Sequence, residues 1–392
     1  MKENKPGLRV LIVVPFTRPD FSGSGINAFN NASYLNGIGY DATILTFNRN
    51  LRLRNREMTE GVKIIRIPYF NKNLLYKILS LPFILLYYLW YVLRNKIIFV
   101  YGAHIIGYQI LIILGKMFKK KVVFRSLLLG ADDMDTLFQD KSGFAKRILR
   151  SLFRLIDIYF AINPVFAEKF KRWIGDDQEI FLSSQGVNIK NFKPCSIEYS
   201  KNLRIKYGFD ESKFLILSVG FLINRKGFSE TFDVMQNLDT DFLYLLVGEN
   251  EFGPNHFMRK YNSQAQKLKE DGIRLLDDKI HFRAATNLMM EYYQMADLVL
   301  INSHSEGVPN TLLEAMACGK TVLAKMIPGT DYIIEHGETG FLYKDSKEMK
   351  EWLLKLQNDK LLLSKIGNRA MEEIRDKWTI SRIWEDLNQK LA

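Results

Sequence analysis

Two carboxylates, Glu306 and Glu314, stand eight positions apart directly after an apolar run of the sequence. The run, residues 297–303, predicts a buried parallel strand, and Thr311–Cys318 predicts a short helix that ends at Gly319. One carboxylate therefore lies in the loop after a strand, and the other lies in the first turn of the next helix. Ligands of open α/β sheets bind at that edge of the sheet. Because carboxylates accept hydrogen bonds from vicinal hydroxyls and helix amino ends attract phosphate, the pair suits a nucleotide-sugar.

Glu314 also has a purely structural interpretation. The segment Thr311-Leu-Leu-Glu314 fits a capping box, in which the glutamate serves only its own helix. In the functional interpretation, Glu314 accepts hydrogen bonds from both ribose hydroxyls and Glu306 faces the sugar that is moved. A charged hydrogen bond of this kind contributes about 1.5–3 kcal/mol.

A second constellation places two adjacent cations between glycines. A predicted strand ends at Gly220, the following loop delivers Arg225 and Lys226, and Gly227 opens the next helix. The departure of a nucleoside diphosphate builds negative charge on its phosphates, which fixed Lys and Arg groups stabilise. Two cations beside glycines are also typical of a solvated surface loop.

A glycine-rich loop is the third constellation. Gly23, Ser24 and Gly25 follow the first predicted strand and precede a helix that is predicted to begin at Ile26. Backbone amides in such a loop can cradle a phosphate or admit an acceptor closely.

The same glycines support an alternative function. Gly23–Ala28 fits a dinucleotide fingerprint, and together with Arg49 after the second strand it indicates an NADP-dependent oxidoreductase. The match is weak, because residues 17–22 separate the glycines from the strand where the fingerprint needs a tight turn.

The histidines predict no metal site, since they lie far apart and lack ligand spacing. They are His104, His256, His281, His304 and His336. His104 follows the predicted strand 97–101 and can line a cleft, although a lone histidine at a strand end is more often structural.

Length and composition indicate an ordinary globular protein of two domains. The chain has 392 residues, no low-complexity tract and only two cysteines, Cys195 and Cys318. This predicts no disulfide framework and favours a reducing compartment. The start of the chain runs directly into the predicted strand 9–14, so we expect no signal peptide and a cytoplasmic location.

The charge of the chain is unevenly distributed. Residues 1–195 carry 29 Lys and Arg against 14 Asp and Glu, whereas residues 196–392 carry 26 against 29. Between Glu60 and Asp132 there are 11 Lys or Arg and no acidic residue. Such a block attracts an anionic lipid surface, a phosphorylated substrate or nucleic acid. A nucleic-acid-binding protein is therefore a second alternative, although the basic block is interleaved with core-like apolar runs.

Within the basic block, residues 78–93 form an uncharged run in which Pro82 is predicted to open a helix. From Pro82 to Leu93 such a helix is about 18 Å long, too short for a bilayer core of about 30 Å. Two interpretations remain: a helix buried against a sheet, or a helix in a membrane interface with Tyr and Trp at headgroup level. The flanking Lys and Arg residues favour the membrane surface.

Strand and helix signals alternate along the chain. They predict an α/β protein of two doubly wound Rossmann-like domains that face one another across a cleft. Residues 1–195 are the predicted acceptor-binding domain and residues 196–374 the predicted donor-binding domain, with a polar hinge at 193–212. A last helical segment, 375–392, is predicted to pack back onto the first domain.

The motifs resemble those of the large retaining glycosyltransferase family 4 of GT-B fold, also known as glycosyl transferases group 1. The resemblance extends over essentially the whole chain, and the paired-glutamate block is its most specific part. It is carried by residues 35–39, 184–194, 218–220, 226–227, 246–248, 293–297, 305–319 and 337–342.

This resemblance implies metal-independent transfer of a sugar from a nucleotide donor, with the anomeric configuration retained and no cofactor. By this resemblance, Glu306 corresponds to the family glutamate that lies near the donor sugar and diphosphate. Glu314 corresponds to the residue that binds the ribose, and Lys226 to the residue that binds the diphosphate. The leaving phosphate is usually drawn as helping to deprotonate the acceptor, so no separate base is required. The further donor-binding residues that the resemblance implies are Gly220, Gly248, Gly307, Val308, Pro309, Asn310 and Thr311. Gly23 matches the family's amino-terminal glycine loop.

The chain departs from the family pattern at two places. The family often has Arg after the glycine that corresponds to Gly220, where this chain has Phe221, so Arg225 is the candidate for the second cation. The family also often carries a histidine after the strand that corresponds to 122–126. Here Asp132 and Asp133 follow, and they are candidates to face the acceptor.

The sequence thus predicts a cytoplasmic glycosyltransferase of polysaccharide or glycoconjugate synthesis. We expect it to be peripheral at the inner face of the cell membrane, with a lipid-linked or glycan-precursor acceptor.

Overall fold

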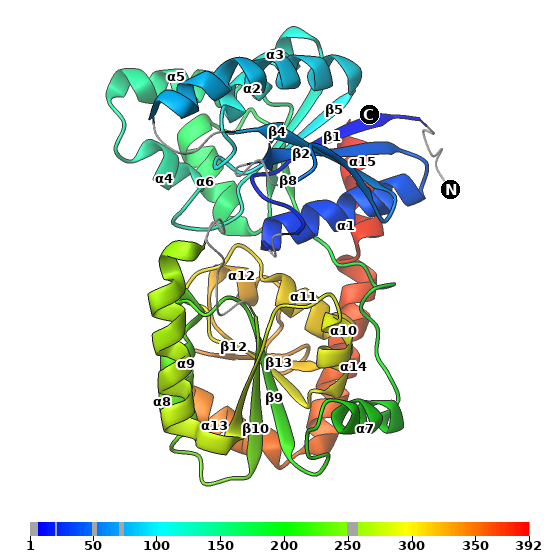
Figure 1. Cartoon of the computed structure of the whole chain (residues 1–392), viewed down its shortest axis with the longest axis vertical. Helices are drawn as coiled ribbons and strands as arrows, with labels where there is room; N and C mark the ends of the chain where they lie inside the picture. The colour runs from blue at the N-terminus through cyan, green and yellow to red at the C-terminus, as the bar shows by residue number, and fades with distance from the viewer. Residues whose placement is uncertain (1–6, 20–21, 49–52, 70–73, 249–257, 392) are drawn as a thin grey trace. The chain divides into compact units, whose positions relative to one another are not determined.

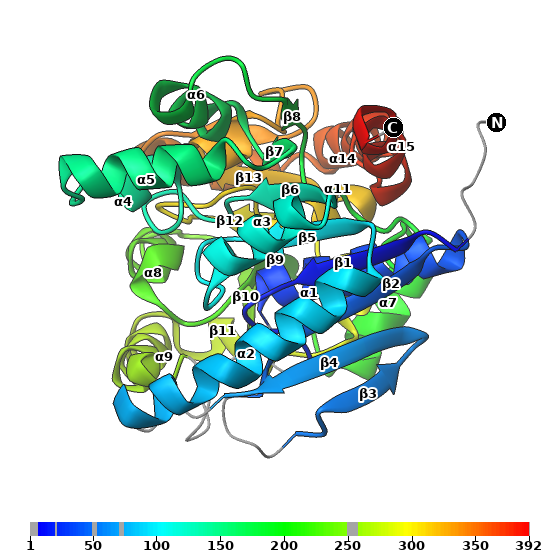
Figure 2. The same ribbon diagram turned by 90° about the horizontal axis from the view of Figure 1, so that it is seen from above.

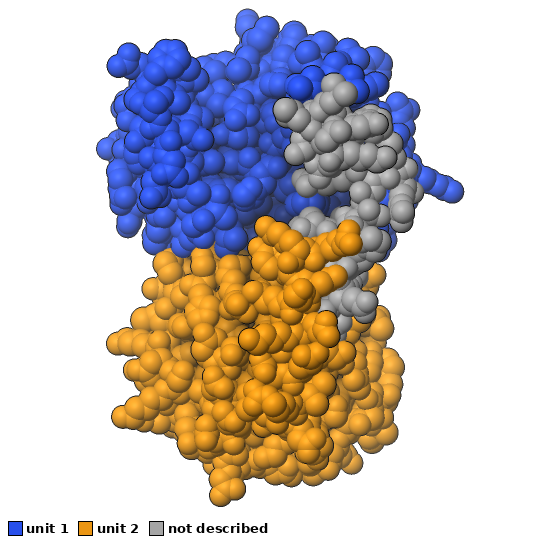
Figure 3. Space-filling view, turned by 60° about the vertical axis from the view of Figure 1, so that its left-hand side comes forward, with its two compact units in different colours: residues 1–185, 383–392 blue, residues 186–382 orange. Residues whose placement is uncertain are grey.

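The computed structural model describes residues 7–19, 22–48, 53–69, 74–248 and 258–391. Figures 1 and 2 show helices on both faces of each of two sheets. The chain forms two compact units (Figure 3): unit 1 contains residues 1–185 and 383–392, and unit 2 contains residues 186–382. Two residues of the sequence analysis, Arg49 and His256, lie outside the described part. The predicted α/β class with two Rossmann-like parallel sheets is confirmed.

Unit 1 has an eight-stranded sheet in which all neighbours are parallel except one edge pair. In spatial order the strands are β3 (Arg56–Thr59), β4 (Val62–Pro68), β2 (Asp41–Asn48), β1 (Arg9–Val13), β5 (Ile97–Tyr101), β6 (Lys121–Arg125), β7 (Ile158–Ala161) and β8 (Ile180–Leu182). The exception is β3, which pairs antiparallel with β4. The sequence analysis missed β3, whose residues Arg-Glu-Met-Thr carry no apolar run.

Helices cover both faces of this sheet (Figure 1). They are α1 (Gly23–Gly37), α2 (Leu74–Arg94), α3 (Tyr108–Met117), α4 (Met134–Phe138), α5 (Gly143–Phe153), α6 (Pro164–Ile174) and α15 (Ile380–Leu391). The last helix joins the first half of the chain through Trp384, which is 2% exposed. Its indole Nε1 donates a hydrogen bond to Asn31 Oδ1 of α1 at 2.5 Å, and its ring packs against Phe99 of β5.

Unit 2 has a six-stranded, fully parallel sheet. In spatial order the strands are β11 (Ile280–Arg283), β10 (Phe242–Val247), β9 (Phe214–Val219), β12 (Leu298–Ile301), β13 (Thr321–Lys325) and β14 (Phe341–Tyr343). The order runs outward in opposite directions from β9 and from β12. The boundary between these two strands is therefore the topological switch point, where parallel sheets bind ligands at their carboxyl ends.

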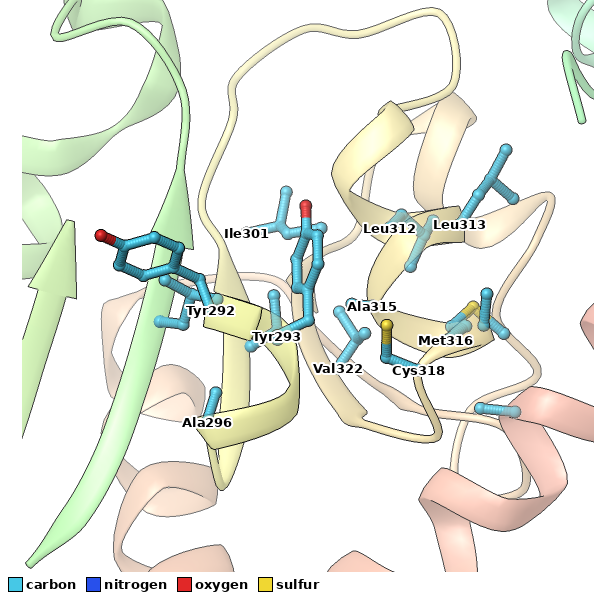
Figure 4. Packing of buried hydrophobic residues seen from close by; sticks show 14 of the residues in the cluster. Tyr292, Tyr293, Ala296, Ile301, Leu312, Leu313, Ala315, Met316, Cys318 and Val322 are labelled. Carbon is cyan, nitrogen blue, oxygen red and sulfur yellow. The ribbon is translucent and has the colours of Figure 1, made fainter. Parts of the chain in front are cut away.

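The helices of unit 2 separate into two layers (Figure 1). They are α7 (Ile197–Lys206), α8 (Phe228–Met235), α9 (Asn262–Leu276), α10 (Met289–Met295), α11 (Asn310–Ala317), α12 (Pro328–Asp331), α13 (Ser346–Gln357) and α14 (Lys360–Lys377). Strand β9 shows why there are two cores, because successive side chains point to opposite faces of the sheet. Leu215 and Leu217 join the cluster with α10, α11 and α14, part of which Figure 4 shows, whereas Phe214 and Ile216 join the cluster with α8, α9 and α13.

The boundary between the units lies ten residues before the predicted one, at Gln185 and Gly186. Val187 belongs to unit 2, because its amide donates to the carbonyl of Trp378 and its carbonyl accepts from the amide of Ile380. The predicted hinge 193–212 instead contains α7 and is part of unit 2.

The predicted carboxy-terminal segment 375–392 is also divided. Residues 375–377 end α14, and only residues 383–392 belong to unit 1. The sequence pattern did not reveal the break, since both helices are amphipathic and Trp378 packs on Tyr332 of unit 2.

Helix α2 begins at Leu74, eight residues before the predicted start, and contains Pro82 in its interior. No helix among the described residues is long and apolar enough to cross a membrane. Ile84, Tyr88 and Val92 of α2 are buried, but its opposite side is also apolar and is exposed. The helix is thus buried on one side, as the first interpretation predicts, and exposes apolar residues on the other side, as the membrane-interface interpretation predicts.

Two further helices of unit 1 also carry exposed apolar side chains, and we call those of the three helices together the apolar face. Helix α2 contacts α3, and α3 contacts α5 (Figure 2). The apolar face consists of Ile78, Leu79, Leu81, Phe83, Leu85, Leu86, Trp90 and Leu93 of α2, Ile113 and Met117 of α3, Phe118 at the carboxyl cap of α3, and Phe144 and Ile148 of α5.

Candidate active site

The side chains of Arg225, Lys226 and Glu306 form one ion cluster in unit 2. Lys226 Nζ lies 2.7 Å and Arg225 Nη1 lies 2.8 Å from Glu306 Oε1. Arg225 Nη1 also donates to the backbone carbonyl of Ser305 at 2.6 Å. The glutamate side chain is 11% exposed, and both cations are more accessible. With two cations and one anion, the cluster carries a net charge of +1.

The cluster lies at the topological switch point. Its cations follow β9 on a short 3-10 turn, Asn224–Lys226, and Glu306 follows β12. The structure therefore brings the predicted cation pair and the first predicted glutamate together, at the carboxyl ends of the two central strands.

Glycines make room for this arrangement. A Cβ on Gly220 would lie 3.0 Å from Lys226 Cε, so the lysine stem passes directly over this glycine. A Cβ on Gly248 would lie 1.9 Å from the carbonyl oxygen of Gly220, and thus Gly248 allows the ends of β10 and β9 to approach. Both predicted glycines position the backbone under Lys226.

The electrostatics favour an ionised Glu306. Burial alone would raise the pKa of this carboxyl, but the nearby charges of Lys226 and Arg225 outweigh burial and hold the pKa below its usual value. Glu306 is therefore a carboxylate at neutral pH.

Glu314 does not form the capping box that the sequence allowed. Helix α11 begins at Asn310, with Pro309 as its N-cap and no side-chain cap hydrogen bond. Glu314 is consequently the fifth helical residue, in the second turn rather than the first. Its Oε2 accepts a hydrogen bond from the hydroxyl of Tyr293 on α10 at 2.8 Å. Figure 4 shows the Tyr293 ring standing between β12 and α11.

Burial raises the pKa of Glu314 to about 7, and the Tyr293 hydrogen bond only partly opposes this shift. The raised pKa predicts a specific pH dependence of stability. Between the ordinary pKa of 4.5 and about 7, the folded protein binds more protons at this site than the unfolded chain, so stability should fall as pH rises. Glu314→Gln should remove this part of the slope, as measured by urea unfolding of both proteins at several pH values from 5 to 8. Parallel stability curves for the two proteins would contradict the raised pKa.

The remaining predicted donor residues connect Glu306 to α11. Val308 is buried, and Pro309 caps the helix that Asn310 and Thr311 begin. Gly307 packs against Gly329 of α12, where a Cβ would lie 2.1 Å from the Gly307 carbonyl oxygen.

In unit 1 the predicted phosphate loop is the first turn of a helix. Helix α1 begins at Gly23 rather than at Ile26, and Ser22 is its N-cap, with Oγ accepting from the amide of Gly25 at 3.0 Å. The sequence analysis placed Gly23, Ser24 and Gly25 before the helix because glycine is a poor helix former. A Cβ on Gly25 would lie 2.5 Å from the carbonyl oxygen of Phe16, so this glycine serves a close backbone approach.

The two predicted acceptor-side aspartates are turned into their own loop. Asp132 is fully buried, and its carboxylate accepts from the amides of Leu127 and Leu128. Asp133 caps α4 and also accepts from Lys169 Nζ at 2.9 Å. The sequence analysis proposed them for the acceptor because they follow the strand after which the family often has a histidine; in the structure both carboxylates make these contacts within unit 1. His104 is exposed, three residues after β5.

Two residues of the site were missed as functional candidates. Tyr293 belongs to the motif 293–297 of the family resemblance, but the sequence alone does not indicate its role, because its contact with Glu314 joins residues 21 positions apart. Asn302 directly follows β12, and its contacts to the turn at Gly227 join residues 75 positions apart. A polar residue at the carboxyl end of a central strand was the available signal. Among the described residues, no group of three or more His, Cys, Asp or Glu side chains could hold a metal ion.

Comparison with known proteins gives a family match in unit 2. Residues 200–373 match the family described as glycosyl transferases group 1. Over 274 residues, 65% of this chain, the sequence is 26% identical to the N,N'-diacetylbacillosaminyl-diphospho-undecaprenol alpha-1,3-N-acetylgalactosaminyltransferase of Campylobacter jejuni. It is 23% identical over 257 residues, 64% of the chain, to the alpha-galactosylglucosyldiacylglycerol synthase of Streptococcus pneumoniae. The matches span 67% and 65% of these relatives' own length.

The fold is shared with solved structures. The HepE protein of Anabaena, solved in complex with UDP-glucose, superimposes with a TM-score of 0.76 at 18% identity. The match covers 98% of this chain and 99% of that one. The predicted GT-B fold is confirmed, and residues 200–373 match the group 1 glycosyltransferases that the sequence analysis named.

Proposed function

The chain belongs to the group 1 glycosyltransferases, enzymes of class EC 2.4, and on that premise we propose that it moves a sugar from a nucleotide-sugar donor bound by unit 2 to a glycan or lipid-linked acceptor. The observation that carries this proposal is the ion cluster of Arg225, Lys226 and Glu306, which lies at the switch point of the unit 2 sheet. Glu314, one helix turn inside α11, supplies the carboxylate for the ribose hydroxyls.

In the proposed reaction, the bond between the anomeric carbon and the phosphate oxygen breaks and negative charge develops on the leaving diphosphate. Lys226 and Arg225 stabilise this charge, and their net excess over Glu306 attracts the diphosphate before the reaction. The acceptor hydroxyl bonds to the anomeric carbon on the face that the diphosphate leaves, so configuration is retained. Its proton passes to the leaving phosphate, which explains why no separate base is needed. The cation pair performs the neutralisation that a divalent ion would otherwise provide, and we propose that transfer is independent of metal.

A thermal-stability screen tests this function. Sugars activated by UDP, GDP, ADP and TDP are added to the purified protein at 1 mM, each with and without EDTA. A ligand present at 100 times its Kd stabilises the folded state by about 2.7 kcal/mol, which gives a readily measured rise in Tm. We expect one nucleobase class to raise Tm and EDTA to leave both the shift and sugar transfer unchanged. A shift caused by NADPH alone would favour the oxidoreductase alternative, and loss of transfer in EDTA would contradict metal independence.

We further propose that the acceptor is attached to a lipid and that unit 1 binds the membrane surface that presents it. The names of both relatives refer to lipids, an undecaprenol diphosphate in one case and a diacylglycerol in the other. The apolar face of α2, α3 and α5 supports this proposal, since many exposed apolar side chains on neighbouring helices are typical of an interaction site. Trp90 stands in this face with the Arg94 guanidinium over its ring, and tryptophan is enriched at membrane–water interfaces. The location that follows is the cytoplasmic surface of the cell membrane.

Flotation with vesicles tests the membrane proposal. The protein should float with vesicles that contain 30% phosphatidylglycerol at low salt and remain unbound with pure phosphatidylcholine, because each Lys or Arg near an anionic surface adds about 1 kcal/mol. The double replacement of Leu86 and Trp90 by Ser should weaken flotation about tenfold or more, since it removes two exposed apolar groups. The control variant Ile273→Ser alters an exposed apolar residue of α9 in unit 2 and should float like the wild type. Equal flotation of all three proteins would exclude the apolar face as the binding surface.

A further inference from the structure

We infer that Asn302, held by Tyr343, is a positioning residue of the donor site that fixes the turn carrying Arg225 and Lys226. The inference rests on the proposed function, because it assigns a role in binding the donor's diphosphate. Neither residue contacts the reacting atoms in this account, and both act through the backbone of the turn.

The amide group of Asn302 is buried, and both its nitrogen and its oxygen form hydrogen bonds within unit 2. The residue follows β12 directly and is 6% exposed. Its Nδ2 donates to the carbonyl of Gly227 at 2.7 Å and to Thr231 Oγ1 at 3.1 Å, while its Oδ1 accepts from the hydroxyl of Tyr343 at 2.8 Å. Because the Gly227 carbonyl can only accept, the amide nitrogen must face the turn.

The segment after β12 makes further contacts with the turn that carries Arg225 and Lys226. The amide of His304 donates to the carbonyl of Arg225 at 2.8 Å, and the Arg225 guanidinium donates to the carbonyl of Ser305 at 2.6 Å. Gly227 has a φ of +68° and packs so closely that a Cβ would lie 2.0 Å from the Asn302 carbonyl oxygen. The cation-bearing turn is therefore fastened to the strand that leads to Glu306.

Tyr343 supplies the hydrogen bond to the oxygen of the Asn302 amide. It lies on β14, is 1% exposed, and its hydroxyl reaches back under β13 to Asn302. The phenol could donate to Oδ1 or accept from Nδ2, whereas the Gly227 carbonyl can only accept, so a reversed amide would face it with an acceptor and lose the hydrogen bond to the turn. Asparagine suits this position because it donates and accepts at once, which neither an ionised aspartate nor leucine can do.

The position of the turn should affect how tightly the diphosphate is bound and leave the binding of the nucleoside unchanged. Lys226 and Arg225 are the groups proposed to hold the phosphates, whereas Glu314 on α11 holds the ribose. A displacement of about 1 Å in a positioned catalytic group can lower the rate about 100-fold. The contribution of the diphosphate to binding, measured as the ratio of the Kd values of nucleoside and nucleoside diphosphate, therefore reports on Asn302 specifically.

The test uses the full chain with UDP and uridine as probes, or with GDP and guanosine if the donor screen selects guanine. In Asn302→Asp, which keeps the shape but loses the donor, we expect Kd for UDP to rise at least tenfold and Kd for uridine to change less than twofold. Lowering the pH should partly restore UDP binding, because a protonated aspartate can again donate to Gly227. With a competent acceptor, kcat should fall more than KM rises, since the developing charge on the leaving diphosphate is greatest in the transition state.

Two further variants keep the test decisive. Tyr343→Phe keeps the Asn302 amide but removes the hydrogen bond to its buried Oδ1, so the ratio of the uridine Kd to the UDP Kd should shift in the same direction by about threefold. Asn237→Asp changes an exposed asparagine just after the C-cap of α8 and should behave like the wild type. Should Asn302→Asp fail to fold, Tyr343→Phe carries the test alone.

The outcomes separate this inference from the proposed function. A wild-type protein that binds no nucleoside diphosphate overturns the proposed function and this inference with it. A wild-type protein that binds UDP, while both Asn302→Asp and Tyr343→Phe keep its ratio of uridine to UDP affinity, overturns the inference alone. An equal loss of UDP and uridine binding also overturns it, because that result indicates a general structural role.

Discussion

Replacing Lys226 by methionine should lower kcat/KM for the nucleotide-sugar about 10²- to 10³-fold, the usual effect of removing one preorganised charge-stabilising donor. The structure explains why this lysine should matter so much. Its stem passes over Gly220, a glycine that leaves room for it, and its ammonium group lies 2.7 Å from Glu306 at the end of the central strands. Methionine keeps most of the apolar stem, so the loss can be assigned to the charge. Steady-state kinetics with the donor identified in the screen provide the measurement.

Lys213→Met is the matched control for this variant. Lys213 lies at the amino end of β9, opposite to the site, and pairs with Asp241 at 3.1 Å. Exposed pairs of this kind contribute about 1 kcal/mol or less, so both activity and Tm should remain close to the wild type. Turnover by Lys226→Met at the level of Lys213→Met would remove Lys226 from the mechanism.

Glu306→Gln should reduce kcat about 10²- to 10³-fold while UDP binding stays the same or becomes tighter. The neutral amide is nearly the same size as the carboxylate, but it no longer offsets the charges of Arg225 and Lys226, both within 3 Å. A cluster of two cations without their anion attracts the diphosphate more strongly. The loss therefore falls on the step in which the sugar is transferred, where we propose that the carboxylate faces the sugar and its developing positive charge.

This split between kcat and affinity is measured by combining turnover with calorimetric titration of UDP. Glu291→Gln serves as the control, because Glu291 is another ion-paired glutamate of unit 2, bonded to Lys206 and Tyr207. It should leave kcat unchanged. A Glu306→Gln protein that turns over like the wild type would refute the assignment of this residue.

The fold could be predicted from the sequence to a large extent, for a local physical reason. Parallel strands buried on both faces produce continuous apolar runs such as Phe242–Val247, and these runs are recognisable without any tertiary information. Strand β3 lacks such a run, and the three-residue strand β14 is too short to produce one, so both were missed. The true start of α2 was missed because Pro82 normally opens a helix, whereas here it lies inside one.

The sequence predicted most residues of the candidate site, but only some of the contacts between them. Glu306, Lys226 and Arg225 follow predicted strand ends, and parallel topology brings such ends to one edge of a sheet. The sequence could not show whether Glu314 caps its own helix, because that depends on the direction of its side chain. In the structure the Glu314 carboxylate accepts a hydrogen bond from Tyr293 instead. The role of Asn302 depends on Tyr343, a residue on a strand that the sequence analysis did not identify.

A crystal structure of the protein with its nucleoside diphosphate sugar tests the central claim most directly. We expect the Glu314 carboxylate within hydrogen-bond distance of both ribose hydroxyls, and Lys226 Nζ on a phosphate oxygen beside Glu306. A donor bound elsewhere, with Lys226 still bonded only to Glu306 and Glu314 only to Tyr293, would contradict the account.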